Sequence, residues 1–207
     1  MKGNLIIISS PSGGGKGTLI REVLKTVPRI GYSVSYTTRA ARTGEINGKD
    51  YFFVTKSEFL DLIGNDEFLE YAEVHGNFYG TSINQVTQQT AAGNDVILEI
   101  DVQGAELILK KVPEATSIFI LPPSYEVLKN RLTSRNTESE ADLVLRLQNS
   151  FDEVKQFDKF DYIVINDEIG RAANDLQTII WAERLKRDRQ STVIRGILDS
   201  FVVLKTT

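Results

Sequence analysis

The chain has 207 residues, 41% of them hydrophobic and 25% charged, so its size favours one domain and its composition excludes the disordered and fibrous classes. A net charge of −4 disfavours a general binder of polyanions or of membrane surfaces. The chain has no Cys and a single His, His75, which excludes disulfides and thiolate metal sites and disfavours a histidine-based zinc site.

The beginning of the chain predicts a strand, a glycine-rich turn and a helix. Residues 4–9 are rich in β-branched side chains, which is typical of a strand buried on both faces. Apolar residues then recur at helical spacing over residues 16–27, and Pro28 ends that pattern. The first apolar run is too short for a secretory signal, and no run has the roughly 18 residues that span a bilayer, so we expect a cytoplasmic protein.

The turn at residues 10–18, SPSGGGKGT, is typical of a phosphate-binding loop (P-loop). Its glycines allow backbone N–H groups to face phosphate oxygens, and Lys16 places an ammonium group at the start of a helix, whose N-terminus also attracts anions. The loop departs from the general pattern at two positions, because Ser10 replaces the first Gly and Gly17 replaces the Ser or Thr after the lysine. The alternative is a glycine-rich turn with an exposed lysine, but the preceding strand and following helix favour a nucleoside triphosphate site.

The rest of the chain mostly alternates strands with helices. Strands are expected at residues 95–100, 116–121 and 161–165, and helices around 105–111, 125–133 and 169–187. This alternation predicts an α/β fold, in which a parallel sheet that carries the P-loop is flanked by helices on both faces. In the last helix, Trp181 is expected to pack in the core together with Ile180 and Leu185.

Two stretches interrupt the alternation. Residues 35–82 predict an inserted α+β lobe, with a short helix that opens on a capping box between Thr55 and Glu58. Residues 133–140, TSRNTESE, are polar and lack apolar periodicity, which indicates a mobile lid. We therefore expect core at residues 1–34, the insertion at 35–82, core at 83–125, a lid region at 126–148, and core with a C-terminal tail at 149–207.

Charged residues in these stretches predict a second anion site. Arg39 and Arg42 are three residues apart, and two guanidinium groups suit a monophosphate because each can bond it in bidentate fashion. The alternative is a solvated basic loop. Glu99 and Asp101 end an apolar strand, where ligands of open α/β sheets bind.

Six motifs, in order, resemble the guanylate kinase family between residue 4 and about residue 190. They are SGGGKGT, SYTTRAARTGEINGKDYFF, EYAEVHGNFYGT, LEIDVQG, RLTSRNTESEADLVLRL and VIND. Six ordered motifs are far more specific than a P-loop alone. The last stretch, residues 191–207, matches no motif, and its sequence leaves open whether it packs on its own core or on a second subunit.

The resemblance implies a role for each residue that matches a family motif. The residues implied to read the guanine base are Ser35, Glu70, Thr81 and Asp101. Those implied to hold the GMP phosphate are Arg39, Arg42, Tyr51 and Tyr79. Those implied to bind ATP are Ser12, Gly13, Gly14, Gly15, Lys16, Gly17, Thr18 and Asn166, with Asn166 at the adenine. The implied catalytic charges are Lys16, Arg39, Arg135 and Arg146, the last two in or beside the lid.

The resemblance further implies direct in-line transfer of a phosphoryl group from ATP to GMP or dGMP, in purine nucleotide metabolism, with Mg²⁺ as the cofactor of ATP. No direct Mg²⁺ ligand is predicted; contact through water near Asp101 or Thr18 is the expectation. The expected partners are ATP and GMP, with no nucleic acid and no membrane, and the oligomeric state is open. His75 is expected to be a structural or surface residue.

Two alternatives to this activity remain open. A guanylate-kinase-like binding module would have little catalysis, but the P-loop glycines and Lys16 favour the enzyme. A monophosphate kinase of another base specificity would share the chemistry. Glu70 and Asp101 favour guanine, because its N1–H and N2 groups donate hydrogen bonds that carboxylates accept.

Overall fold

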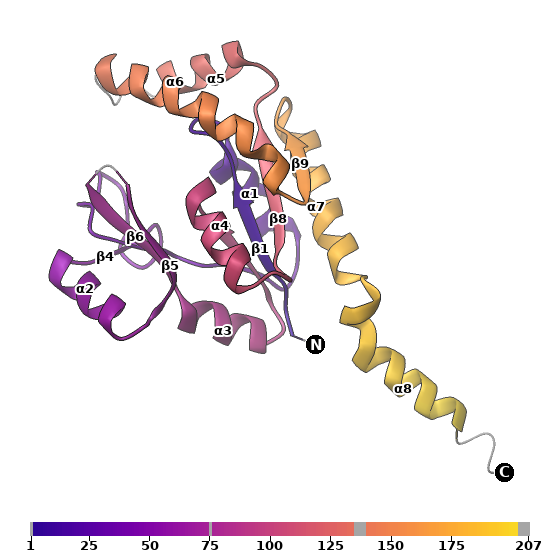
Figure 1. The fold of residues 1–207 in the computed structure, drawn as a ribbon. Coiled ribbons are helices and arrows are strands. Elements are labelled where there is room, and N and C mark those ends of the chain that lie inside the picture. Colours follow the sequence, from indigo (N-terminus) through magenta and orange to yellow (C-terminus); the bar gives the residue numbers. More distant parts are fainter. Residues whose placement is uncertain (1, 75, 135–139, 203–207) are drawn as a thin grey trace.

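The computed structural model describes residues 2–74, 76–134 and 140–202, which form two sheets and their flanking helices (Figure 1). The larger sheet is parallel, with the order β2-β7-β1-β8-β9. Its strands are β1 (Leu5–Ser9), β2 (Ile30–Tyr32), β7 (Asp95–Glu99), β8 (Thr116–Leu121) and β9 (Tyr162–Ile165). Strand β1 lies at the centre, with Ile7 paired to Leu98 on one side and to Ser117 on the other.

Helices cover both faces of this sheet because its strands are apolar on both faces. Ile6 and Ile8 of β1 belong to the core beneath α1 (Lys16–Thr26) and α7 (Ile169–Arg184). Leu5 and Ile7 belong to a second core beneath α3 (Ile83–Ala91) and α4 (Val102–Lys111). The α/β class expected from the sequence is confirmed.

The expected packing of the last helix is wrong for two of three residues. Ile180 of α7 is fully buried, whereas Trp181 is 43% exposed and Leu185 is 72% exposed. Ile180 lies one helical turn after buried Leu176 and faces the sheet, so the next residue is rotated by about 100° away from it. The Trp181 ring instead lies 4.7 Å from the guanidinium carbon of Arg184.

The smaller sheet forms the inserted lobe, with the order β4-β3-β6-β5. Its strands are β3 (Tyr36–Thr37), β4 (Phe52–Phe53), β5 (Phe68–Val74) and β6 (Asn77–Ser82), and α2 (Lys56–Gly64) packs against them. The capping box of Thr55 and Glu58 at the start of α2 is confirmed. The fully buried Phe59 of α2 stacks on Phe68 and Phe78, so aromatic contacts make up the small core of this lobe.

The remaining elements are α5 (Tyr125–Thr133), α6 (Glu140–Val154), η1 (Lys155–Lys159), η2 (Arg187–Gln190) and α8 (Ser191–Val202). Helix α8 extends away from the rest of the molecule, and residues 191–201 are all exposed (Figure 1). Residues 135–139, which include Arg135 and most of the expected lid, lie outside the described residues, as does His75. Within the described part of the chain, no helix is long and apolar enough to cross a membrane. The expected division into segments stays a prediction.

Candidate active site

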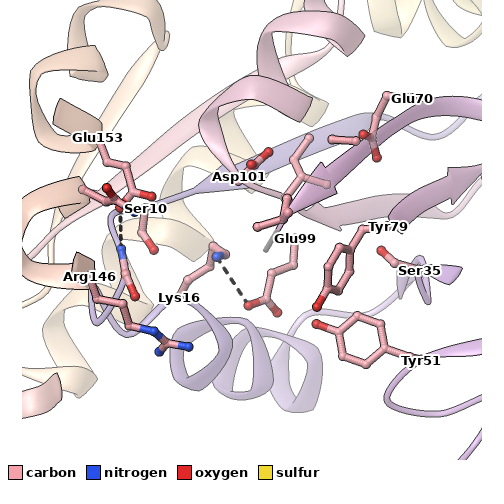
Figure 2. Close-up of a pocket in the computed structure, with 15 residues that line it drawn as sticks. Ser10, Lys16, Ser35, Tyr51, Glu70, Tyr79, Glu99, Asp101, Arg146 and Glu153 are labelled. Carbon is pink, nitrogen blue, oxygen red and sulfur yellow. Dashed lines mark hydrogen bonds and ion pairs between the residues drawn. The ribbon is translucent and has the colours of Figure 1, made fainter. Parts of the chain in front are cut away.

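A cavity of about 360 Å³ lies where β1 and β7 end, between the larger sheet, the inserted lobe and α6 (Figure 2). Ligands of open α/β sheets bind at this edge of the strands. The cavity brings together eight of the residues to which the resemblance assigns a role, namely Ser12, Lys16, Ser35, Tyr51, Glu70, Tyr79, Asp101 and Arg146, and also Glu99. Residues that are hundreds of ångströms apart in an extended chain thus meet in one site.

The P-loop has a backbone that requires glycine at two positions. Gly13 and Gly15 have φ values of +83° and +90°, in the left-handed region that side chains disfavour. A Cβ atom on Gly15 would lie 2.2 Å from Nδ2 of Asn166, so the position is closed to a side chain as well as strained. Gly15 precedes α1, whose first turn, residues 16–19, contains no acidic residue, so the helix N-terminus faces the cavity without a carboxylate of its own.

Two side chains brace the P-loop from behind. Asn166 is 2% exposed, and its Nδ2 donates to the carbonyl oxygen of Gly14 at 2.8 Å. Arg131 donates to the same carbonyl at 3.3 Å and to the carbonyl of Asn166 at 2.8 Å. The side chain of Asn166 is therefore engaged with the loop in this structure, and its contact with an adenine stays a prediction.

A carboxylate from α6 contacts the phosphate loop. The backbone N–H of Ser12 donates to Oε2 of Glu153 at 2.8 Å. This N–H belongs to a loop whose amides suit anions, so the Glu153 carboxylate lies where a negatively charged ligand group is expected. Glu153 was not among the residues expected at the site, because it lies in an ordinary helical stretch outside the motifs.

Glu99, at the end of β7, lies between Lys16 and the tyrosines of the inserted lobe (Figure 2). Its Oε1 is 3.7 Å from Nζ of Lys16, and its Oε2 accepts a hydrogen bond from the Tyr32 hydroxyl at 3.2 Å. Burial and the nearby Glu99 raise the pKa of Tyr32, which keeps this hydroxyl protonated as a donor. A Cβ atom on Gly17 would lie 3.4 Å and 3.6 Å from the two carboxylate oxygens of Glu99.

A second carboxylate, Glu70 of β5, is buried at the far end of the cavity. It is 6% exposed, and its Oε1 accepts a hydrogen bond from the hydroxyl of Thr81 at 2.6 Å. Burial, supported by the neighbouring Asp101, raises the pKa of Glu70 to about 7, although the Thr81 hydrogen bond opposes the rise. Asp101 caps α4, with its Oδ1 accepting from the N–H of Gly104 at 2.8 Å. Two carboxyl groups thus face one small polar region.

The two arginines of the inserted lobe are held by an acidic neighbour. Nη2 of Arg39 lies 2.8 Å from Oε1 of Glu45, and the backbone N–H of Arg42 donates to Oε2 of the same side chain at 2.7 Å. The guanidinium of Arg39 also lies 5.4 Å from the centre of the Tyr51 ring, which lines the cavity. Within the described residues, neither arginine itself lines the cavity, and Glu45 keeps the pKa of Arg39 raised.

Metal-binding side chains are sparse. Among the described residues, no group of three or more His, Asp or Glu side chains could hold a metal ion. Side-chain oxygens near the P-loop include those of Glu99, next to Gly17, and Oε2 of Glu153, which accepts from Ser12. The hydroxyl of Thr18 accepts from Arg21 at 3.3 Å.

Comparison with known proteins places this chain in a family. The family model described as guanylate kinase matches residues 2–183. The chain is 46% identical to the guanylate kinase of Carboxydothermus hydrogenoformans over 188 residues, which covers 91% of this chain and 92% of the relative. It is 50% identical to that of Neisseria meningitidis serogroup A over 199 residues, with coverages of 96% and 97%. The crystal structure of guanylate kinase from Anaplasma phagocytophilum is 36% identical, with a TM-score of 0.79 over 96% of this chain and 95% of that one.

Proposed function

The chain belongs to the guanylate kinase family, and we propose from this premise how its cavity transfers the γ-phosphoryl group of ATP to GMP, giving ADP and GDP. The observation that carries the proposal is that one cavity holds a P-loop lysine at one end and the buried carboxyl group of Glu70 at the other. A phosphate donor and a base with hydrogen-bond donors can therefore be bound in the same space.

The P-loop is the proposed ATP site. Backbone N–H groups of the loop and the N-terminus of α1 bind the phosphates, together with Thr18. Lys16 leaves its ion pair with Glu99 and neutralises the β and γ phosphates. The incoming phosphates also displace the Glu153 carboxylate from the N–H of Ser12. We propose that Asn166 contacts the adenine after its side chain turns away from the carbonyl oxygen of Gly14.

The opposite end of the cavity is the proposed GMP site. Ionised Glu70 accepts hydrogen bonds from guanine N1–H and N2, held in place by Thr81 and assisted by Ser35 and Asp101. Adenine has an acceptor at N1, which would leave the buried carboxylate unpaired, and such a mismatch costs on the order of 10⁴ in specificity. The GMP phosphate is bound by Arg39, Arg42, Tyr51 and Tyr79, and Arg39 turns from Glu45 to reach it.

The family uses ATP with a divalent metal, and we propose Mg²⁺ for this chain. The residues present fit that ion, because Mg²⁺ keeps several waters and binds through one or two carboxylates and the substrate phosphates. Glu99 and Asp101 supply carboxylates at the cavity, and a cage of three acidic side chains is not required. When bound, Mg²⁺ neutralises charge on the β and γ phosphates.

The protein contributes position and charge to the transfer, and no covalent intermediate is needed. The attacking oxygen of the GMP phosphate is already ionised near pH 7, so no general base is required. Lys16, Arg39, Arg135 and Arg146 neutralise the oxygens of the group in transfer. Closure of the lid region and the inserted lobe over the cavity excludes water, which would otherwise attack ATP.

A panel of acceptors tests the proposal. ADP release is measured with ATP and each of GMP, dGMP, AMP, CMP and UMP, and we expect GMP and dGMP to be strongly preferred. Preference for AMP would reject the assignment of Glu70, and absence of transfer to every acceptor would favour a binding module. Lys16→Met should lose transfer by at least 10³-fold with the fold intact, as monitored by circular dichroism, because the lysine charge is needed mainly in the transition state. Near-normal turnover by this variant would contradict the role of the P-loop.

A further inference from the structure

Glu153 of α6 binds the phosphate loop with a carboxylate. Its Oε2 accepts a hydrogen bond from the backbone N–H of Ser12 at 2.8 Å, and both residues line the cavity. A hydrogen bond from a backbone N–H to a carboxylate is about twice as strong as one between neutral groups. The N–H groups of such a loop are also the donors that bind phosphate oxygens. The Glu153 carboxylate and a nucleotide phosphate therefore suit the same donor.

Helix α6 lies outside both hydrophobic cores of the larger sheet, since none of its described residues belongs to either core. Its main packing partners are its neighbours in the sequence, α5 and η1. Phe151 of α6 stacks on Tyr125 of α5 with the ring centres 5.1 Å apart, and both rings are exposed. A helix held in this way can shift without opening the cores. The hydrogen bond of Glu153 is thus an important link between α6 and the P-loop.

The face of α6 that bears Glu153 also bears a cation. Arg146 precedes Glu153 by seven residues, or about two helical turns, so the two side chains point the same way. Both line the cavity, on the same side of it (Figure 2). Helix α6 therefore presents a negative group near its C-terminal end and a positive group about 10 Å earlier along its axis. Of the two, only the positive group attracts a loop that holds phosphates.

We propose that Glu153 competes with the nucleotide phosphates for the P-loop, and that α6 exchanges this carboxylate for Arg146 when a nucleotide binds. The proposal rests on the proposed function of the P-loop as an ATP site and concerns the regulation of that site. Without nucleotide, the carboxylate holds α6 on the N–H of Ser12. With nucleotide, phosphate oxygens take this N–H, repel the carboxylate and attract the guanidinium. The apparent affinity for nucleotide is then lower than the affinity of the uncovered loop.

A carboxylate that only supported the loop would behave in the opposite way. Its removal would leave the N–H of Ser12 unpaired, loosen the loop and weaken nucleotide binding. Removal of a competitor strengthens nucleotide binding instead. The sign of the change in affinity therefore separates the two roles.

The first test is calorimetric titration of wild type and of Glu153→Gln, which keeps the size of the side chain and removes its charge. The ligands are the β,γ-imido analogue of ATP at a fixed Mg²⁺ concentration, and GMP, which is assigned to the other end of the cavity. We expect the variant to bind the analogue about tenfold more tightly, with unchanged affinity for GMP. Equal or weaker binding of the analogue would overturn the proposal. Failure of the analogue to bind wild type would instead reject the ATP site itself.

Two further variants separate the contact from the charge. Asp152→Asn is the control, because it removes a neighbouring carboxylate of α6 that is exposed and paired with Lys155, and its affinity for the analogue should equal that of wild type. Glu153→Asp keeps the charge but is one methylene group shorter, so it should lose the contact with Ser12 and bind the analogue more tightly than wild type does. Wild-type affinity in Glu153→Asp would reject the contact as the cause, and this variant also serves if Glu153→Gln fails to fold.

The exchange on α6 is tested with spin labels. The chain has no Cys, so labels on Gln148→Cys, at an exposed position of α6, and on Asp175→Cys, at an exposed position of α7, report a single distance. We expect the distance distribution of the labelled protein to change when the analogue binds. Addition of Glu153→Gln should produce part of that change without nucleotide. Coincident distributions with and without Glu153→Gln would show that this carboxylate does not hold α6 on the loop, and would reject the proposal.

Discussion

The pKa of Glu70 predicts how GMP binding depends on pH. The carboxyl group is buried, its pKa is raised to about 7, and guanine requires the ionised form because N1–H and N2 both donate. With this pKa, about 9% of free enzyme carries the carboxylate at pH 6 and about 91% at pH 8. This side chain alone should therefore make GMP bind about tenfold more tightly at pH 8 than at pH 6.

The assay is calorimetric titration of GMP into wild type and Glu70→Gln from pH 6 to pH 8. The GMP phosphate also titrates in this range, so the quantity to follow is the ratio of the two dissociation constants at each pH. At pH 8 the variant should bind about 10- to 100-fold more weakly, because a Gln amide offers one acceptor where the carboxylate offers two. The ratio should shrink by about tenfold on lowering the pH to 6. A ratio independent of pH would refute the reasoning.

The raised pKa of Glu70 also predicts how the stability of the ligand-free protein depends on pH. A carboxyl whose pKa rises from 4.5 in the unfolded chain to about 7 in the fold stabilises the fold fully below pH 4.5, and that stabilisation is lost between pH 4.5 and 7. The loss amounts to about 3 kcal/mol. The free energy of unfolding in urea should therefore fall less between pH 5 and pH 8 for Glu70→Gln than for wild type.

Other substitutions test the scaffold. Gly15→Ala should lower the free energy of unfolding by about 1–2 kcal/mol because of its positive φ, and should abolish ATP binding as the loop moves away from Asn166. The control is Gly196→Ala, in open space on α8, which should be neutral or stabilising by up to about 1 kcal/mol. Calorimetry and thermal melts compare the two variants, and normal ATP binding by Gly15→Ala would contradict the loop geometry. Asp95→Asn removes the carboxylate that Arg184 contacts at 2.6 Å, at the end of β7 that lies away from the cavity. It should lower the free energy of unfolding by about 3 kcal/mol and leave kcat unchanged. A free energy of unfolding within about 0.5 kcal/mol of wild type, roughly the scatter of surface changes, would show that this ion pair does not behave as a buried one.

The features that the sequence predicts well depend on local spacing. The strand, turn and helix around the P-loop follow from β-branched runs, glycines and helical periodicity within about 25 residues, and the capping box of α2 follows from Thr55 and Glu58 alone. The inserted lobe is predicted as an interruption of the alternation between strands and helices. The same local signals could not place Trp181, because apolar character does not say which side of α7 meets the sheet.

The contacts that the sequence could not predict join parts of the chain that are far apart. Glu153 meets Ser12 across 141 residues, and Arg131 meets Gly14 across 117, so both depend on where α5 and α6 pack over the P-loop. Neither has a distinctive local pattern. Glu45 is different, since it lies three residues after Arg42 in the same loop, and an acidic residue so close to two arginines is a signal that sequence reasoning could have used.

The central position of β1 has a consequence for the rates at which backbone amides around the site exchange with deuterium. All five residues of β1 are buried and the strand is paired on both sides, so its amides should exchange with deuterium only when the whole protein unfolds. In the inserted lobe, β3 and β4 have two residues each, and their amides should exchange through local opening. The cavity thus has one wall on the slowest-exchanging strand and another on fast-exchanging ones. A ligand that spans both should slow exchange in the lobe by holding it closed, and should slow exchange in β1 by stabilising the whole fold against unfolding.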